Sequence, residues 1–216
     1  MTDLFLDAPA PRPSRRPVAR DAHGEPWEDP YAWLRDDAFP TLADPTVKAH
    51  LEAENRYADA VLEPLAPLKQ ALRDQLAARM DPKEQGVPWR STAGTFRWAF
   101  REGAQYPCWY CLDGDDEALI LDEPALAEGA TAFSLGAFAP SPRGRFLAYA
   151  VDRSGSEHYE LRYRPLRGGR ETAVHDCASG GVVWAGDESG FYYLIQNDQW
   201  RPYQLRWHAL GSDPGA

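Results

Sequence analysis

Two short motifs in the sequence combine residue types that can do chemistry. Cys108 and Cys111 form a C-x-x-C pair, which is the spacing of a redox dithiol or of half a zinc site. The pair lies in the aromatic, strand-like segment 106–113, and residues three apart on a strand point to opposite faces, so the two sulfurs should diverge. No second C-x-x-C and no H-x-x-x-H is present to complete a zinc shell. We therefore expect no metal site and no redox function here, although the sequence does not define what the pair does.

Ser156 and His158 bring a nucleophile and a base close together in the sequence. They fall in a polar loop between two expected strands, with no orienting carboxylate or oxyanion donor evident. The G-x-S-x-G nucleophile elbow of the α/β-hydrolases occurs nowhere in the 216 residues. The sequence thus predicts no catalytic residue, no cofactor and no metal ligand in this chain.

The first third of the chain should be helical. Asp44-Pro45 has the pattern of a helix start, an N-cap acid followed by Pro at the first helical position. Apolar residues then recur with a helical period, which Pro64 and Pro67 interrupt. The two apolar stripes are Val47, Leu51, Ala58, Val61 and Leu62, then Leu68, Leu72, Leu76 and Met80. Asp81-Pro82 should end the second helix.

Carboxylates also gather in this first third, at Glu52, Glu54, Asp59 and Glu63. They lie opposite the apolar stripe, which favours a solvated helix face over a set of catalytic acids. Upstream, Asp29-Pro30 should open a short helical turn that presents two aromatics as an anchor for a neighbouring surface.

Residues 9–20 alternate prolines with four arginines. One interpretation is a basic arm that binds an acidic partner. We favour a solvated polyproline-type lead-in, or an arm that docks on the acidic body of the chain itself.

After Gly86 the pattern changes to short β-rich runs that repeat. Residues 138–149 align with 183–194 at a spacing of 45, and 159–166 align with 203–210 at a spacing of 44. A further copy of the segment 159–166 starts at Tyr106. A period of about 45 residues with three or four short strands is typical of a β-propeller blade. We therefore predict a mainly β fold with a helical N-terminal segment and an incomplete β-propeller of about three blades.

A single blade cannot bury its apolar face alone, so neighbouring blades are needed. Alternation in the copies at Tyr159 and Tyr203 puts one apolar face toward the next blade. An open blade edge after Leu210 is a template for strand pairing, which makes self-association a possible alternative role.

The composition of the chain limits the classes of partner that it can bind. The chain has 23 Lys+Arg against 33 Asp+Glu, a net charge of −10, which argues against nucleic acid as a partner and suits a basic one. No apolar run approaches the roughly 20 residues that span a bilayer. Met1–Asp7 has no basic region followed by a long apolar stretch, so we expect no secretory signal. With three cysteines, an odd number, these features favour a cytoplasmic location and no membrane partner.

The pieces together resemble the N-terminal part of the oligopeptidase B group in the prolyl oligopeptidase family of serine peptidases. The matching stretches are His23-Gly24, residues 29–36, residues 51–57, Val87-Pro88, residues 101–107, 133–142, 148–157 and 180–185. They are long, in order, and cover nearly the whole chain from about Arg16. One departure is Cys111, where the family usually has a basic residue after the aromatics.

The resemblance implies an architecture. In that family a helical segment packs against an α/β-hydrolase domain, and a seven-bladed propeller caps the active site and filters substrates by size. The hydrolase domain comes last, carries the Ser, Asp and His, and cleaves peptides after basic residues. On this basis we expect a Pro/Arg-rich arm over 1–20, a wrapping helical segment over 21–82 and the first blades over 86–216.

The same resemblance leaves this chain without a catalytic domain. We expect it to supply gating and scaffold, with basic oligopeptides and a hydrolase domain as partners in the full-length protein, and to be inactive alone. The alternative is a stand-alone module that uses its open blades to bind a partner or a second copy.

Overall fold

The computed structural model describes residues 9–38 and 41–212, with the side chain of Cys177 excepted. The prediction made for Met1–Asp7 lies outside this part. The chain divides into two compact units, Met1–Arg79 and Met80–Ala216, which we call the helical unit and the sheet unit.

The helical unit starts with a β-hairpin that the sequence pattern did not indicate. Its elements are β1 (Val18–Ala22), β2 (Glu25–Asp29), the 3₁₀ turn η1 (Ala32–Leu34), α1 (Pro45–Leu62), the 3₁₀ turn η2 (Glu63–Leu65) and α2 (Ala66–Ala77). His23 and Gly24 link β1 to β2 with φ angles of 59° and 83°, which a two-residue hairpin turn of this kind requires.

The predicted helix start is confirmed. The Asp44 carboxylate accepts hydrogen bonds from the backbone N–H groups of Thr46 (2.7 Å) and Val47 (3.3 Å), as an N-cap does. The end of α2 differs from the prediction, because the helix stops at Ala77 rather than at Asp81-Pro82. Its last turn tightens there, with the Arg79 N–H bonded to the Leu76 carbonyl (3.1 Å).

The turn η1 anchors the arm that precedes it. The Trp33 indole N–H donates to the Ser14 carbonyl (2.9 Å), and the Arg16 guanidinium lies 4.3 Å from the Trp33 ring centroid. The ring of His50 on α1 is 6.1 Å away from that of Trp33. Part of the 9–20 arm therefore docks on its own unit, through a cation–π contact.

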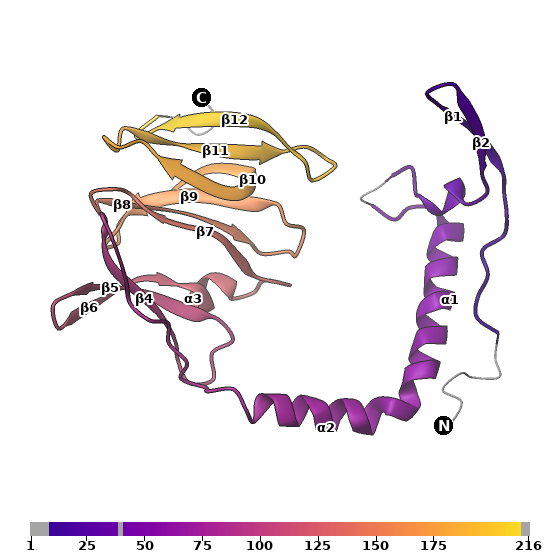
Figure 1. The fold of residues 1–216 in the computed structure, drawn as a ribbon, viewed down its shortest axis with the longest axis horizontal. Helices are drawn as coiled ribbons and strands as arrows, with labels where there is room; N and C mark the ends of the chain where they lie inside the picture. The colour runs from indigo at the N-terminus through magenta and orange to yellow at the C-terminus, as the bar shows by residue number, and fades with distance from the viewer. Residues whose placement is uncertain (1–8, 39–40, 213–216) are drawn as a thin grey trace. The chain divides into compact units, whose positions relative to one another are not determined.

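The sheet unit is antiparallel throughout (Figure 1). One sheet has the order β3-β4-β5-β6, and the other has the order β12-β11-β10-β9-β8-β7. The elements are β3 (Trp89–Ser91), β4 (Gly94–Phe100), β5 (Pro107–Asp113), β6 (Asp116–Asp122), α3 (Glu123–Ala127), β7 (Ser134–Pro140), β8 (Phe146–Asp152), β9 (Tyr159–Pro165), β10 (Thr172–Trp184), β11 (Gly190–Gln196) and β12 (Pro202–Ala209).

The six-stranded sheet is two blades joined through one long strand. The first half of β10 pairs with β9, its second half pairs with β11, and the register shifts between Ala178 and Val182. We therefore name β3–β6 blade 1, β7–β9 with the first half of β10 blade 2, and the second half of β10 with β11 and β12 blade 3. This arrangement confirms a mainly β fold with a helical segment and a partial β-propeller.

The structure corrects the repeat register. Blades 2 and 3 are related by one spacing of 44 residues, because Pro140↔Leu147 pairing recurs as Trp184↔Phe191. The turn bonds recur likewise, from Gly144 N–H to Ser141 and from Glu188 N–H to Ala185. The spacing of 45 was one residue too long, because it matched Phe146 with Phe191 and Gly144 with Ser189. In the fold Gly144 (φ 68°) is equivalent to Glu188 (φ 61°).

Two hydrophobic cores lie between successive blades. The core between blades 1 and 2 is formed by Phe96, Cys111, Ile120, Leu121, Phe133, Leu147, Tyr149, Val151 and Leu166. The core between blades 2 and 3 is formed by Ala148, Ala150, Leu161, Tyr163, Val174, Ala178, Phe191, Tyr193 and Ile195. Blade 2 thus contributes one face to each core.

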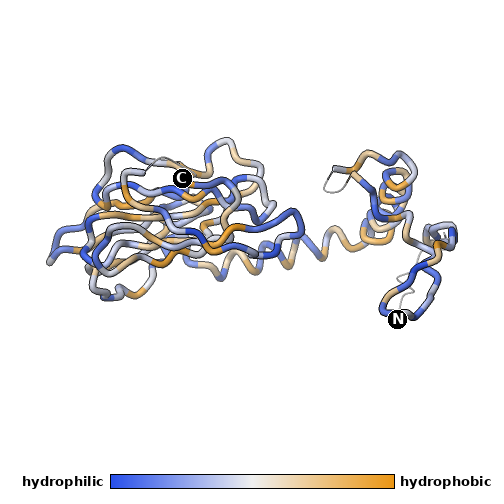
Figure 2. Tube along the Cα trace, turned by 90° about the horizontal axis from the view of Figure 1, so that it is seen from above, coloured by the Kyte–Doolittle hydropathy of each residue, from blue (hydrophilic) through white to orange (hydrophobic). Residues whose placement is uncertain are grey.

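Helix α2 keeps its apolar stripe at the surface. Hydrophobic and hydrophilic positions alternate along the coil of α2 (Figure 2), and Leu68, Leu72 and Leu76 are all at least half exposed. Within the described ranges, no helix is both long and apolar enough to cross a bilayer.

Candidate functional site

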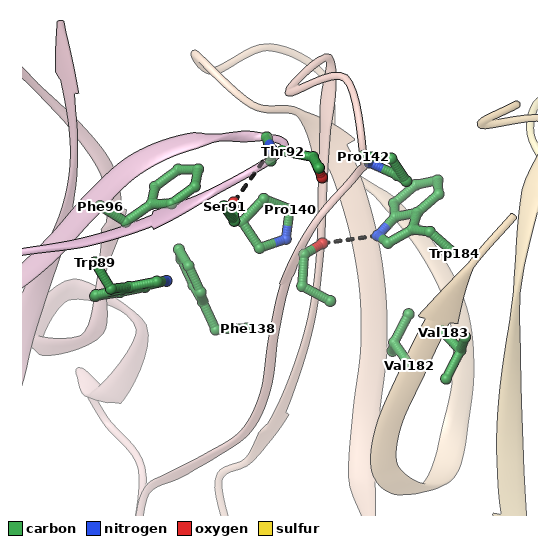
Figure 3. Close-up of a pocket in the computed structure, with 12 residues that line it drawn as sticks. Trp89, Ser91, Thr92, Phe96, Phe138, Pro140, Pro142, Val182, Val183 and Trp184 are labelled. Carbon is green, nitrogen blue, oxygen red and sulfur yellow. Dashed lines mark hydrogen bonds between the residues drawn. The ribbon is translucent and has the colours of Figure 1, made fainter. Parts of the chain in front are cut away.

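A groove forms where the first strands of the three blades converge (Figure 3). It encloses about 400 Å³. Its walls come from β3 and the β3–β4 turn, from the end of β7, and from the second half of β10, with Phe96 of β4 alongside. In a propeller the blades surround a central channel, so the converging strands place this groove on the channel side.

Packed aromatic rings fix one wall of the groove. Phe138 stacks on Trp109 with ring centroids 4.4 Å apart, and Trp89 meets Trp109 edge-on at 5.8 Å. On the other side, the Trp184 indole N–H donates to the Ala139 carbonyl (2.8 Å) and ties blade 3 to blade 2. Trp89 remains 36% exposed, which leaves its ring available to an occupant of the groove.

The lining of the groove suits binding of another group rather than catalysis. None of its lining residues carries a charge, and its side-chain hydroxyls belong to Ser91 and Thr92. The Ser91 hydroxyl is already engaged by its own turn, since it accepts from the Ala93 N–H at 3.1 Å. Such a surface can hold apolar or aromatic groups, and its lining includes no thiol, imidazole, carboxylate or amine that could act as a base.

A buried carboxylate lies behind the aromatic wall. Glu123, 5% exposed, accepts a hydrogen bond from the Trp109 indole N–H at 2.5 Å. Burial raises the pKa of Glu123, and the Trp109 hydrogen bond offsets part of that rise. The sequence signal available here was Asp122-Glu123-Pro124, a helix start: Asp122 caps α3 through the Ala125 N–H (3.1 Å).

A second buried carboxylate locks blade 3 to blade 2 at the turns beside the groove. The Glu188 side chain has no exposed surface and accepts from the Arg143 N–H (2.6 Å) and from Arg145 Nε. Burial raises its pKa, but hydrogen bonds from Ser141, Arg145 and the Arg143 N–H outweigh this, so the pKa lies below its ordinary value.

The turn of blade 2 that contains Gly144 is equivalent to the Glu188 turn of blade 3. It contacts blade 1 through its backbone rather than through a side chain. A Cβ added to Gly144 would lie 2.4 Å from the Ala93 carbonyl oxygen, so only glycine fits at this distance. Sequence reasoning missed the Glu188 contact, because a one-residue alignment error hid the match between Gly144 and Glu188.

Cys108 and Cys111 are both buried, free thiols on β5. Cys111 belongs to the core between blades 1 and 2, whereas Cys108 Sγ lies 3.8 Å from Asp122 Oδ1. Burial raises the pKa of Cys108, with a further rise from the Asp122 charge that Arg101 partly opposes. A raised thiol pKa disfavours the reactive thiolate.

Ser156 and His158 do not form a nucleophile–base pair. The His158 ring stacks on Trp200, with centroids 5.2 Å apart, and its Nε2 is buried without a hydrogen-bond partner among the described residues. The Ser156 hydroxyl accepts from the Ser154 hydroxyl at 2.8 Å. The loop is organised by Asp152, whose carboxylate accepts from the backbone N–H groups of Ser154, Gly155 and Glu157.

The four carboxylates that the sequence gathers on α1 and at the start of η2 do not form a site of their own among the described residues. Glu52, Asp59 and Glu63 are exposed, and Glu54 lies 3.6 Å from His50 one helical turn away. In the part of the chain that the structure describes, no group of three or more His, Cys, Asp or Glu side chains is placed to hold a metal ion.

Comparison with known proteins gives a consistent result. The family profile described as "Prolyl oligopeptidase, N-terminal beta-propeller domain" matches residues 11–216. The chain is 35% identical over 197 residues to the uncharacterized peptidase y4sO of Sinorhizobium fredii, covering 89% of this chain and 27% of that protein. It is 29% identical over 232 residues to dipeptidyl aminopeptidase BI of Pseudoxanthomonas mexicana, covering 97% and 31%.

Solved structures show the same likeness. Oligopeptidase B from Trypanosoma brucei, in a closed form with covalently bound antipain, is 25% identical with a TM-score of 0.77, over 94% of this chain and 31% of that one. Oligopeptidase B from Leishmania major has a TM-score of 0.80 at 21% identity, over 96% and 32%, which is a likeness of fold. The chain spans less than a third of the length of these relatives.

Proposed function

The chain belongs to the prolyl oligopeptidase family, in the N-terminal β-propeller domain, and from this premise we propose that it is the gating and scaffold region of an oligopeptidase B-like peptidase that cleaves peptides after basic residues. The observation that carries the proposal is the family match over residues 11–216, which takes in the helical segment and the three successive blades. Relatives named as peptidases and a similarity to a solved oligopeptidase B at 25% identity support it.

In this proposal the sheet unit forms part of a channel that admits peptides. The groove on the channel side is uncharged and aromatic, so it would contact the apolar parts of a passing peptide. The charge of −10 suits basic peptides in a general way, as a long-range attraction. Selection of the basic residue itself would belong to the hydrolase domain of the full-length protein.

The helical unit supplies the second part of the proposal. The exposed stripe of Leu68, Leu72 and Leu76 is the surface that we expect to pack against the hydrolase domain, with residues 21–82 as the wrapping segment. The Pro/Arg-rich arm over 1–20 and the blades over 86–216 complete the proposed organisation. A cytoplasmic location remains a prediction from the composition and the N-terminal sequence.

The test starts from the DNA that follows codon 216. We expect a reading frame, direct or shifted, that encodes a G-x-S-x-G nucleophile elbow. The protein expressed from this continued frame should hydrolyse a reporter peptide ending in Arg or Lys faster than one ending in Pro or Ala. The 216-residue chain, assayed in parallel, should hydrolyse neither.

Two results would contradict the proposal. A continued product that prefers the Pro reporter would assign the chain to a prolyl-specific peptidase instead. Turnover of the Arg reporter by the purified 216-residue chain, unchanged after repeated removal of contaminating peptidase, would show that the catalytic machinery lies within these residues.

A further inference from the structure

A buried acid holds one of the tryptophans behind the groove. The Trp109 indole N–H donates to the Glu123 carboxylate at 2.5 Å, and Glu123 is 5% exposed. The Trp109 ring stacks on Phe138 with centroids 4.4 Å apart and planes 19° apart, and it meets Trp89 edge-on. Phe138 and Trp89 line the groove (Figure 3), whereas Trp109 and Glu123 are not among its lining residues. Glu123 therefore acts on the groove through the ring that it holds.

Local structure fixes both ends of this hydrogen bond. On the acceptor side, Asp122 caps α3 by accepting from the Ala125 N–H at 3.1 Å, which restrains the backbone at Glu123. On the donor side, the pairing of β5 with β6 shifts its register between Trp109 and Tyr110. An irregularity of this kind re-aims the side chains beside it. The capped helix and the register shift together bring the carboxylate and the indole into contact.

Blade 1 differs from the other two blades at this position. Trp109 pairs with Trp98 across β4 and β5, and the matching pairs in blades 2 and 3 place Leu161 and Leu205 there. A leucine carries no polar group, so it needs no acceptor. A tryptophan needs one, and the buried carboxylate that accepts its hydrogen bond costs free energy to remove from water. Packing of one blade on the next requires neither residue, which indicates a role for the pair in the groove.

The tryptophans around the groove differ in what their indole N–H groups contact. The Trp109 N–H donates to Glu123, and the Trp184 N–H donates to the Ala139 carbonyl. Among the described residues, the Trp89 N–H has no acceptor, and its ring is partly exposed. An aromatic wall with one unused donor suits an apolar side chain that is followed by a backbone carbonyl. The uncharged lining disfavours a charged side chain, which would leave water without a partner.

On the basis of the proposed function, in which the groove contacts peptides, we propose that Glu123 is a positioning residue of this groove. It holds the Trp109 ring and, through that ring, sets Phe138 and Trp89 for an uncharged segment of peptide. Loss of the acceptor leaves the Trp109 N–H unpaired, so the ring turns toward water and its stack with Phe138 loosens. The groove then binds such a segment less tightly, although none of its own lining residues has changed.

The experiment follows the tryptophan indole N–H resonances of the isotope-labelled 216-residue chain by heteronuclear NMR. Substitution of single tryptophans by phenylalanine assigns the resonances of Trp89 and Trp109. The probe is acetyl-Phe-Leu-amide, a neutral capped dipeptide, and its dissociation constant comes from the shift of the Trp89 resonance. Acetyl-Ser-Gly-amide is the control probe, because it offers the same backbone carbonyls without an apolar side chain.

The Glu123 variants should affect the groove in a graded way. Glu123→Ala should shift the Trp109 resonance and weaken binding of the probe about fivefold, which is roughly the worth of one hydrogen bond. Glu123→Gln keeps an acceptor oxygen and should stay within about twofold of the unmodified chain. Leu161→Ala is the matched control, because it removes buried contacts from the other core and is not part of the groove lining. It should lower stability and leave probe binding unchanged.

A second pair of variants tests the route through Trp109. Trp109→Phe keeps a ring but removes the donor of the hydrogen bond. In that background Glu123→Ala should have no further effect on probe binding, because the interaction between the two residues is already absent. Circular dichroism and urea denaturation of each variant confirm that the comparisons are made between folded chains.

Four outcomes would overturn the positioning role. Unchanged binding in Glu123→Ala, with binding lost in Trp89→Ala, would leave the groove as a peptide contact that does not depend on Glu123. Equal weakening in Leu161→Ala would assign the effect to stability alone. A full loss from Glu123→Ala in the Trp109→Phe background would show another route. Failure of the unmodified chain to bind the probe would also remove the groove from the proposed function, whose peptidase activity is tested separately in the continued frame.

Discussion

The three strands of blade 3 repeat β7, β8 and β9 of blade 2 at a spacing of 44 residues and keep most of their pairing register, but the two blades differ greatly in burial. Leu161 of blade 2 is 1% exposed, and its equivalent in blade 3, Leu205, is 62% exposed. Local sequence decides that each segment becomes a strand and which way its side chains point. Burial, and the free energy that goes with it, is decided by whether another sheet packs on that face.

The largest expected effect compares these two leucines directly. Leu161→Ala removes buried methyl groups from the core between blades 2 and 3, at a cost of about 2–5 kcal/mol in the free energy of unfolding. Leu205→Ala should cost less than about 0.5 kcal/mol in the monomer, because its side chain is largely in water. Urea denaturation at low protein concentration measures both, and equal costs would show that blade 3 is covered in solution.

The contact of Glu188 with the turn of blade 2 gives the next largest expected loss of stability. Glu188→Ala leaves the Arg143 N–H without its acceptor and removes the partner of Arg145, at a cost of about 2 kcal/mol. Glu188→Gln keeps an acceptor oxygen and should lose less. If both variants are as stable as the unmodified chain, the turns do not hold the blades together.

The smallest expected effect is a pH dependence of stability, which comes from His208 at the contact between the same two blades. His208 is 2% exposed and lies near the rings of Tyr163 and Phe191, and burial lowers its pKa below the ordinary 6.5. The folded chain keeps His208 neutral while the unfolded chain takes up a proton. Stability should therefore fall as the pH drops through about 6.5 toward the lower folded pKa.

The matched variant for this prediction is His208→Phe, which keeps a ring in the same place. Its unfolding free energy should fall less than that of the unmodified chain between about pH 7.5 and about pH 5.5. The difference between the two proteins isolates His208 from other groups, including His175, whose pKa burial and Arg206 also lower. Parallel pH curves would show that His208 is hydrated in the folded state.

Much of this architecture follows from the sequence. The helix start at Asp44-Pro45 depends on a local N-cap, and the strands of the blades depend on the spacing of apolar residues. Both can be read from the sequence. The hairpin at His23-Gly24 was not predicted, because its strands are short and exposed and so lack an alternation of apolar and polar residues.

The candidate site was harder to predict for a different reason. Glu123 and Glu188 are buried by residues from other strands, and nothing in their own neighbourhood of the chain marks them as buried. Trp89 and Trp184 likewise meet one groove only because three blades converge there. Such properties depend on the register between blades, where an error of one residue exchanges the two faces of a strand.

The long strand β10 has a mechanical consequence. No loop separates blade 2 from blade 3, so tension along the chain passes directly from one blade to the next through Thr172–Trp184. The hydrogen bonds to β9 and β11 would be loaded in shear, many at once, rather than opened one by one. The ladder is interrupted where the register shifts, between Ala173 and Ala178 on the β9 side and between Ala178 and Val182 on the β11 side, and the second of these shifts marks the passage from blade 2 to blade 3.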